Sequence, residues 1–495
     1  MSTNFFKTSA ALGAGMVLAA SALVAPGAVG APIADLAAAW GENGNGELGN
    51  GKDQGFGVPV AVDTSGVLAA KALTAISAGE WSTCVVADGK AYCWGGNTGS
   101  TLGDLTPTTS SVPVPVDTSG VLAGVTVTAV SAGYEHSCVV ADGKVYCWGH
   151  NGAGQLGDNS TTDSPLPVAV SMSGVLEGKT VTAISAGEEH TCVVADGKAY
   201  CWGAGFNGQL GNGSNWPSSV PVAVRTGGGL GTKTITAISA GGDHSCAIAE
   251  GRAYCWGRNH HGQLGNDGSI DSNVPVRVAG VMAGRKVTAI SAGWWHTCAV
   301  AGGKAYCWGD SSRRGLDSGT TTGSKVPVAI DTSGVLAGKT LTAISAANAH
   351  TCAVASGKAY CWGNNWAGQL GNKSTKYSSV PVTVNNGGVL AGRTITAIST
   401  GGRHSVVLTA PGAVTEVTAV NKNGQVAITW RPVAGATSYR VRMSKPGGKK
   451  YARWETTVKR LFKAKVKQGK QYRFQVAAIA ASGRGPATTI RFKGR

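Results

Sequence analysis

The sequence predicts an all-β protein: a seven-bladed β-propeller with a split closing blade of two plus two strands, followed by a β-sandwich. Three observations support this prediction. Twelve cysteines form six Cys-x8-Cys pairs, whose first members lie 54, 54, 54, 52 and 54 residues apart. Glycine makes up 75 of 495 residues, and short alternating apolar runs recur without stretches of helical period. The charge balance changes abruptly at residue 411, which marks a domain boundary.

Each cysteine pair encloses the signal of a two-residue β-hairpin. In the third repeat, Asp196-Gly197 lies between alternating apolar residues, which favours a type I′ turn. Counting outward from this turn places Cys192 opposite Cys201, within disulfide range. The alternative is a reduced trio with His190 that holds zinc and keeps one position open. We expect neither metal nor cofactor, and we expect six disulfides: Cys84–Cys93, Cys138–Cys147, Cys192–Cys201, Cys246–Cys255, Cys298–Cys307 and Cys352–Cys361.

Each repeat contains four short strands, expected in the third repeat at residues 182–185, 192–194, 199–202 and 220–224. Strands at this density and with a fixed period are typical of a β-propeller with one blade per repeat.

The two ends of the repeat region predict how the ring closes. The region begins with a second half-repeat around Trp40 and ends with a first half-repeat around His404. Joining the halves completes a seventh blade and gives a propeller over residues 39–409. Ala39 and Val406 occupy the two cysteine positions of that blade, and cross-strand partners are expected to be lost together.

The repeated motifs resemble those of a known family. They are Ser185-Ala186-Gly187, His190-Thr191, the Asp-Gly hairpin, Tyr200…Trp202-Gly203 and Gly208-Gln209-Leu210-Gly211. On these motifs, residues 39–409 resemble the regulator of chromosome condensation repeat family, which implies a seven-bladed propeller with the same split closure. The cysteine pairs depart from the family's usual pattern. The family's precedents are nucleotide exchange on a nuclear GTPase, inhibition of a secreted β-lactamase, and ultraviolet sensing through tryptophans. The sensing motif Gly-Trp-Arg-His-Thr is approached once, at residues 293–297, where arginine is absent.

The first 30 residues predict a secretory signal peptide. Lys7 precedes a small-apolar stretch over residues 10–25, and small residues lead to a cleavage site near Gly30. A membrane anchor is the alternative, but the stretch is short and broken by glycine. We expect no membrane span after signal removal. A secreted location, with cell-wall association as an option, suits the disulfides and excludes exchange on a nuclear GTPase.

Residues 411–495 form a basic module. They hold 19 Lys+Arg and 2 Asp+Glu, whereas residues 1–410 hold 24 of each. The module resembles a fibronectin type III domain, which implies that Trp430 lies in a sandwich core and Tyr472 at a tyrosine corner. A solvated basic surface without a ligand is the alternative to a polyanion-binding site. The expected polyanion-binding residues are Lys459, Arg460, Lys463, Lys465, Lys467 and Lys470.

The repeats differ from one another in sequence mainly in the loops at one end of the blades. Non-repeating aromatic and charged residues there predict a partner-binding face, against the alternative of drift at solvated loop tips. The protein also divides into an acidic half over residues 1–200, with a balance of −10, and a basic half over residues 201–410, with +10. The expected partner-binding residues are Trp81, Tyr134, Glu135, Glu188, Glu189, Phe206, Asp243, Arg258, Trp294, Trp295, Arg313, Arg314, Trp366 and Arg403.

These observations predict a secreted, monomeric, non-enzymatic binding or adhesion protein. Its partner would be an extracellular protein or a cell-surface polymer, with the basic module anchored to a polyanion. An enzyme inhibitor that uses the same face is the alternative. A carbohydrate-active enzyme is a third class, which requires carboxylates such as Glu188 and Asp243 to converge in a cleft.

Overall fold

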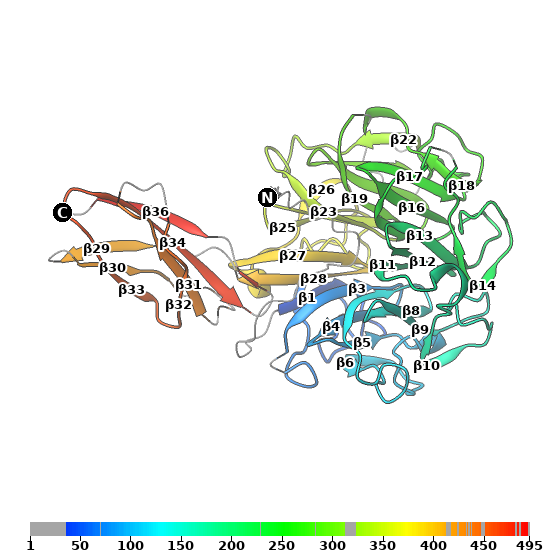
Figure 1. Cartoon of the computed structure of the whole chain (residues 1–495), viewed down its shortest axis with the longest axis horizontal. Coiled ribbons are helices and arrows are strands. Elements are labelled where there is room, and N and C mark those ends of the chain that lie inside the picture. Colours follow the sequence, from blue (N-terminus) through cyan, green and yellow to red (C-terminus); the bar gives the residue numbers. More distant parts are fainter. Residues whose placement is uncertain are drawn as a thin grey trace, which may run out of the picture.

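The structure is a computed structural model whose fold is all-β, a propeller of repeated four-stranded sheets followed by a smaller pair of sheets (Figure 1). The expected signal segment, residues 1–30, and the expected site residues Arg313 and Arg314 lie outside the described residues. Within the described chain, no helix has the length and apolar character needed to span a membrane. The described residues are 36–69, 71–227, 229–282, 284–311, 323–411, 417–422, 425–431, 433, 436, 438–446, 451–480, 483–484 and 487–493.

Six four-stranded sheets follow one another along the chain, and we number them as blades 1 to 6. Blade 1 contains β3 (Leu73–Ala78), β4 (Ser82–Ala87), β5 (Lys90–Gly95) and β6 (Ser110–Pro115). Blade 2 contains β7 (Val127–Ala132), β8 (His136–Ala141), β9 (Lys144–Gly149) and β10 (Ser164–Ala169). Blade 3 contains β11 (Val181–Ala186), β12 (His190–Ala195), β13 (Lys198–Gly203) and β14 (Ser218–Ala223).

Blades 4 to 6 repeat this arrangement. Blade 4 contains β15 (Ile235–Ala240), β16 (His244–Ala249), β17 (Arg252–Gly257) and β18 (Ser272–Arg277). Blade 5 contains β19 (Val287–Ala292), β20 (His296–Ala301), β21 (Lys304–Gly309) and β22 (Ser324–Ala329). Blade 6 contains β23 (Leu341–Ala346), β24 (His350–Ala355), β25 (Lys358–Gly363) and β26 (Ser378–Thr383). Four short 3-10 helices lie in connections: η1 (Thr98–Ser100), η2 (Gly174–Leu176), η3 (Gly280–Met282) and η4 (Gly388–Leu390).

A seventh four-stranded sheet, which we call the shared sheet, draws its strands from both ends of the propeller segment. Its order is β2-β1-β28-β27. In this sheet Ala39 pairs with Val406 across β1 and β28. The strands are β1 (Leu36–Gly41), β2 (Phe56–Ala61), β27 (Arg393–Thr400) and β28 (His404–Pro411).

The cysteine register is the one expected from the hairpin count. Cys192 pairs with Cys201 across β12 and β13, and β14 ends one residue earlier than expected, at Ala223. All six predicted disulfides are present, with Cα–Cα separations of 4.0–4.1 Å, and the described residues include no free cysteine. Because the bridges lie inside single blades, they stabilise each hairpin and do not join one blade to the next.

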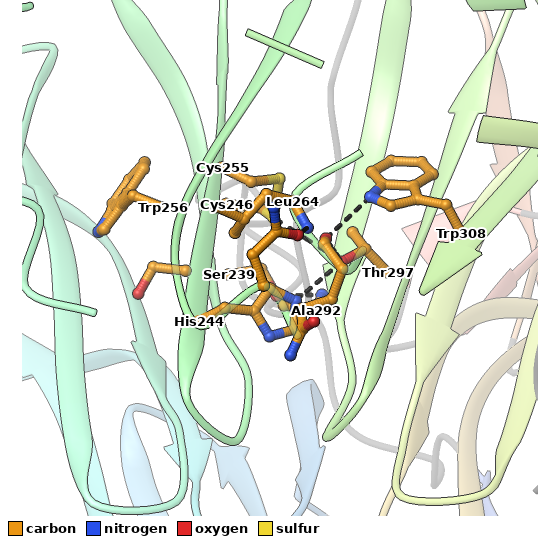
Figure 2. Close-up of a disulfide and its surroundings, with 12 residues drawn as sticks. Ser239, His244, Cys246, Cys255, Trp256, Leu264, Ala292, Thr297 and Trp308 are labelled. Atoms are coloured by element: carbon orange, nitrogen blue, oxygen red, sulfur yellow. Dashed lines mark hydrogen bonds between the residues drawn. A yellow bond between two sulfur atoms is a disulfide. The ribbon is translucent and has the colours of Figure 1, made fainter. Parts of the chain in front are cut away.

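Neighbouring blades are joined through one buried backbone carbonyl, as Figure 2 shows for blades 4 and 5. The Gln263 carbonyl oxygen accepts hydrogen bonds from Trp308 Nε1 at 2.9 Å and from Thr297 Oγ1 at 2.8 Å. His244 Nε2 lies 2.8 Å from the same threonine hydroxyl. A Cβ at Gly265 would lie 2.6 Å from Trp308 Nε1, so this position requires glycine. Equivalent pairs of bonds reach the carbonyls of Glu47, Thr101, Gln155, Gln209 and Gln369.

This geometry fixes the protonation of the histidine that opens the second strand of blades 2 to 6 and also opens β28. Thr297 has one hydroxyl hydrogen and donates it to Gln263, so its oxygen must accept from His244 Nε2–H. His244 is therefore the neutral Nε2–H tautomer, and burial lowers its pKa to about 3. Burial likewise lowers the pKa of the equivalent histidines to about 3 (His136, His350 and His404) or about 4 (His190 and His296). Ser82 takes this position in blade 1.

A second set of inter-blade hydrogen bonds surrounds the centre of the ring. In each case a backbone N–H of one innermost strand donates to a serine Oγ of the preceding one, as Ala292 does to Ser239 at 2.9 Å (Figure 2). Seven such bonds link the six blades and the shared sheet in turn, and the bond from Ala78 to Ser399 returns to the start. These bonds therefore form a continuous series through the six blades and the shared sheet.

Two further sheets follow the propeller. One has the order β29-β30-β33, and the other contains β32-β31-β34-β35 with β36 beside β34. Their residues share one core that includes Trp430, Tyr439, Tyr472 and Phe474. The sheets lie beyond β27 and β28 in Figure 1, and β34 and β35 contact β28. The strands are β29 (Thr418–Lys422), β30 (Gln425–Thr429), β31 (Ser438–Met443), β32 (Glu455–Thr457), β33 (Leu461–Lys465), β34 (Gln471–Ala480), β35 (Gly483–Arg484) and β36 (Thr488–Lys493).

The buried histidines predict steep acid unfolding. Each histidine has an ordinary pKa of 6.5 in the unfolded chain and about 3 or 4 in the folded protein, so below pH 6.5 the unfolded state binds more protons. The free energy of unfolding should fall as the pH falls, by up to about 8 kcal/mol per pH unit near pH 5 if all six histidines contribute. Urea denaturation between pH 7.5 and pH 5 measures the slope. His244→Ser should reduce the proton uptake by about one, and a slope near zero would contradict the neutral tautomers.

The pairing of Ala39 with Val406 predicts that a seventh bridge can be introduced. Ala39→Cys/Val406→Cys should oxidise spontaneously, because these residues hold the register that every native disulfide occupies. The new bridge would close a loop of about 367 residues, so the chain-entropy model gives up to about 6 kcal/mol, against about 2.5–3 kcal/mol for a hairpin bridge. Thiol titration and thermal unfolding test this, with Ala39→Ser/Val406→Ser as control. Two free thiols after air oxidation would contradict the pairing.

Candidate binding surface on the loop face

The two ends of the blades differ in chemistry. We call the end with hairpin turns such as Asp196–Gly197 the turn face, and the opposite end the loop face. Each innermost strand ends at the loop face in a tip that precedes the histidine position, and the loop after Trp-Gly lies beside this tip because His190 pairs with Gly203. The expected partner-binding residues within the described chain lie on this loop face. Since β28 ends at the turn face, the C-terminal sheets lie on the opposite side from the tips.

The first residues of the seven tips surround the central opening of the ring. Their backbones are fixed, as where Glu188 N–H donates to the Gly241 carbonyl of the next blade at 3.1 Å. The opening is a cavity of about 100 Å³. The tip residues that line it are Glu80, Tyr134, Glu188, Gly242, Trp294, Asn348 and Gly402.

Aromatic rings from blades 2 and 5 meet across this opening. The ring centroids of Tyr134 and Trp294 are 5.5 Å apart in an edge-to-face arrangement, and those of Trp294 and Trp295 are 6.4 Å apart. Trp295 also contacts His261, at 5.5 Å between centroids, and the Arg258 guanidinium lies 5.1 Å from its ring. These five residues form a continuous surface that we call the aromatic strip, which runs outward from the centre of the ring.

A second cluster lies where the shared sheet meets blades 1 and 6. The Arg403 guanidinium lies 4.5 Å from the Trp366 ring and 5.6 Å from the Trp81 ring, both within cation–π range. Its Nη1 lies 3.8 Å from Glu42 Oε2. We call Trp81, Trp366 and Arg403 the arginine–tryptophan cluster.

Carboxylates gather beside the aromatic strip. Burial, followed by the charges of Asp243, Glu189 and Glu80, raises the pKa of Glu188 to about 7, and Arg258 opposes this shift. Burial and neighbouring carboxylates, of which Glu135 is the first, also raise the pKa of Tyr134. Arg258 Nη1 forms an ion pair with Asp243 Oδ2 at 2.9 Å.

Glu80 is nine-tenths buried at the edge of the opening. A Cβ at Gly402 would overlap its carboxylate as it lies in this structure. Asp243 is already held by Arg258, and the described residues contain no group of three His, Cys, Asp or Glu side chains arranged to hold a metal ion.

The structure brings most of the expected partner-binding residues into these groups. Phe206 lies apart, 63% exposed on the loop after β13, and Glu189 is exposed beside the carboxylates. Sequence reasoning missed Trp216, 72% exposed, and Ile270, 83% exposed, which occupy equivalent positions before β14 and β18. Neither residue type recurs at this position in the other blades, so a search for non-repeating apolar residues extended to the longer outer loops could have found both.

The expected polyanion-binding residues are exposed on the C-terminal sheets. Lys463 and Lys465 alternate along β33 with the half-buried Phe462 and Ala464. Lys459, Arg460, Lys467 and Lys470 are exposed in the flanking segments. Within the same module, Lys467 N–H donates to the Tyr472 hydroxyl at 2.8 Å, and Trp430 packs edge-to-face on Tyr439 at 5.3 Å.

Comparison with known proteins identifies the family of the propeller. A family model described as RCC1-like domain matches residues 37–407, which is most of the chain.

Curated relatives share this region. The human E3 ubiquitin-protein ligase HERC2 is 29% identical over 340 residues, which cover 68% of this chain and 7% of the ligase. The Ultraviolet-B receptor UVR8 of Arabidopsis thaliana is 28% identical over 347 residues, which cover 68% of this chain and 74% of the receptor. The chain therefore spans a small fraction of the ligase and about three quarters of the receptor.

Solved structures with the same fold include human WBSCR16, with a TM-score of 0.65 and 23% identity, covering 76% of this chain and 99% of that one. Yeast RCC1 (Prp20), solved bound to Kap60, has a TM-score of 0.66 and 20% identity, covering 82% of this chain and 95% of that one. At these identities the likeness shows the fold alone.

The raised pKa of Glu188 predicts a stabilising substitution. In the unfolded chain this carboxyl has a pKa near 4.5, so between pH 4.5 and 7 the folded state binds more protons and stability falls as the pH rises. Glu188→Gln removes the buried charge and should raise the free energy of unfolding at pH 8 by about 1 kcal/mol, a value reduced for solvent screening. At pH 5 the gain should largely disappear. Denaturant melts at both pH values measure this, with the exposed Glu189→Gln as control. Equal gains at both pH values would contradict the assignment.

Proposed function

Since this chain belongs to the RCC1-like domain family, we propose that it is a non-enzymatic binding protein whose loop face holds a protein partner. One observation carries the proposal. The residues that join the blades repeat around the ring, whereas the aromatic strip and the arginine–tryptophan cluster are unique to their blades and lie on fixed tips.

The composition of the loop face supports this role. Tryptophan, tyrosine and arginine are the residues most enriched among the energetic centres of protein interfaces. Here they are already packed against one another, as in the contacts of Trp295 with Arg258 and Trp294. A surface ordered before binding loses less conformational entropy when a partner arrives.

The charge distribution of the propeller favours a protein partner with one basic and one acidic half. Residues 1–200 carry a balance of −10 and residues 201–410 one of +10, so the two halves of the ring attract opposite charges. A protein with complementary halves would be steered into a defined orientation. The carboxylates around Glu188 and the cations Arg258 and Arg403 would then provide polar contacts around the aromatic centre.

We also propose that the shared sheet is the split closing blade of a seven-bladed ring, and that the protein is exported. The pairing of β1 with β28 and the return of the serine hydrogen bonds to Ser399 support the closure.

Six hairpin disulfides suit an oxidising compartment, which supports export of the protein. Determining the N-terminal residue of the mature protein tests export, because signal-peptide cleavage is expected near Gly30.

The C-terminal sheets, in this proposal, form a fibronectin type III sandwich that binds a polyanion at the surface of the producing cell. The packing of Trp430 and the bond that Tyr472 accepts from Lys467 support the sandwich. The exposed lysines of β33 support the polyanion. Because these sheets lie on the turn-face side, the loop face would remain open for the protein partner.

An enzyme inhibitor is the second candidate, since a rigid aromatic face suits inhibition as well as adhesion. The two candidates differ in the partner. An inhibited enzyme would lose activity on addition of one equivalent of this protein, whereas an adhesion partner has no such readout.

Partner capture tests the proposal. Intact protein and Trp81→Ala/Trp294→Ala/Trp295→Ala would be used as baits for the medium and surface extract of the producing cells. The triple variant should bind at least about 30-fold more weakly, because buried interface tryptophans carry most of the binding energy. Trp216→Ala is the matched control, since it removes an exposed tryptophan of the loop face outside both clusters. Equal capture of every partner by all three proteins would show that the binding site lies outside the aromatic strip and the arginine–tryptophan cluster.

A further inference from the structure

The turn face carries a cavity that none of the proposed functions uses. It has a volume of about 330 Å³ and lies between the hairpin of blade 4 and the connection to blade 5. Residues 250–253, Arg277, Val278, Met282 and residues 284–287 line it. The loop face lies at the other end of these strands, so this site is independent of the proposed protein partner.

The cavity coincides with the one irregular spacing of the repeats. Residues 278–286 connect β18 to β19, which makes nine residues, whereas residues 224–234 make eleven between β14 and β15. The connections 62–72, 116–126, 170–180 and 330–340 also have eleven residues, and 384–392 has nine only because β27 begins two residues earlier than the other innermost strands. The loss of two residues between β18 and β19 accounts for the single 52-residue interval between cysteine pairs.

Four cations surround the cavity: Arg252, Arg277, Arg285 and Lys286. Two of them replace neutral residues of the other blades. Elsewhere the position of Arg277 holds Ala61, Pro115, Ala169, Ala223, Ala329 or Thr383. The position of Lys286 holds Ala72, Thr126, Thr180, Thr234, Thr340 or Thr394.

The ammonium group of Lys286 extends beyond the space that a threonine fills. A Cβ at Gly251 would lie 3.0 Å from Lys286 Cγ, and a Cβ at Gly197 would lie 2.8 Å from Thr234 Cγ2 in blade 3. The lysine stem therefore occupies the threonine position, and its charge lies farther out.

The four cations are exposed, and Arg285 Nε donates to the Val281 carbonyl at 3.4 Å. The four ion pairs found among the described residues include none of Arg252, Arg277, Arg285 and Lys286. Glu250 is the one carboxylate among the lining residues. In blade 5 the hairpin turn is Gly302–Gly303, where blade 3 has Asp196–Gly197, so an acidic residue is also missing on that side.

The floor of the cavity is apolar. Ala253, Val278, Met282 and Val287 line it and are each at least nine-tenths buried. A ligand for this site therefore combines an anionic group with a less polar body. Three guanidinium groups favour phosphate in particular, since they bind its oxygens through paired hydrogen bonds.

We propose that this cavity binds the phosphate group of an organic phosphate ester, with Arg277 and Lys286 as its specific ligands and the ester's carbon skeleton against Val278 and Met282. The phosphate is held by Arg252, Arg277, Arg285 and Lys286, and Glu250 excludes ligands with a second anionic group on its side. A phosphate-bearing surface polymer and a free sugar or polyol phosphate both present this chemistry.

Isothermal titration of full-length protein tests the site, with glycerol 3-phosphate, a poly(glycerol phosphate) chain, inorganic phosphate and inorganic sulfate as separate probes. The variant Arg277→Ala/Lys286→Thr introduces the residues of the other blades, and Arg277→Gln/Lys286→Gln removes the charges at nearly unchanged size. Lys144→Ala/Lys198→Ala is the matched control, because it removes two exposed cations from the turn face of blades 2 and 3. Thermal melts of all variants verify folding.

Intact protein and the control should bind glycerol 3-phosphate equally at one site, more tightly than sulfate. Both Arg277/Lys286 variants should bind it at least about tenfold more weakly. If the poly(glycerol phosphate) chain binds as tightly per phosphate as glycerol 3-phosphate, the source of the ligand is a surface polymer. If glycerol 3-phosphate binds and the polymer does not, the source is a free metabolite. Equal affinity of the control and the Arg277/Lys286 variants would overturn the proposal.

A further variant separates this site from the C-terminal module. Lys463→Ala/Lys465→Ala should leave ester binding unchanged, whereas it should weaken retention on polyphosphate if the proposed polyanion site exists. Loss of ester binding in this variant would overturn the cavity proposal, and unchanged retention would contradict only the proposed function of the module.

Discussion

A buried carbonyl oxygen that accepts two hydrogen bonds lies in six of the contacts between neighbouring sheets of the propeller. In blade 4 the Gln263 carbonyl uses both lone pairs, one for Trp308 Nε1 and one for Thr297 Oγ1. This arrangement forces the threonine to accept from His244 and keeps the imidazole neutral. A buried carbonyl without these donors would cost free energy of desolvation, so the loop, the tryptophan and the hydroxyl have to occur together. That requirement explains why they repeat as a set. The histidine accompanies them except in blade 1, where Ser82 takes its position.

A scaffold fixed in this way allows the tips to vary. The disulfides act inside blades and the carbonyl contacts act between them, so neither depends on the side chains at the central opening. Tyr134 and Trp294 can therefore meet across the ring, and Arg403 can lie between two tryptophans, without loss of stability elsewhere. The same freedom exists on the turn face, where one cavity is lined by a shortened connection and two added cations.

The two faces have distinct chemistry because every strand runs from one to the other. The loop face combines aromatic rings with partly buried carboxylates such as Glu188. The turn face carries the cationic cavity, and β28 ends there beside the basic C-terminal sheets. A protein partner on one face and anionic ligands on the other would therefore bind without competition.

The repeats in the sequence were sufficient to predict the blades, the pairing of Cys192 with Cys201 and the face that bears the variable residues, because strand register follows from counting residues around a two-residue turn. Counting also gave the one 52-residue interval, between Cys246 and Cys298, although not the cavity that lies within it. The meeting of Tyr134 with Trp294, the raised pKa of Glu188 and the convergence of Arg277 with Lys286 were decided only by the tertiary structure. These contacts join different blades or different ends of a connection, and their distances depend on the curvature of the whole ring, which no local pattern records.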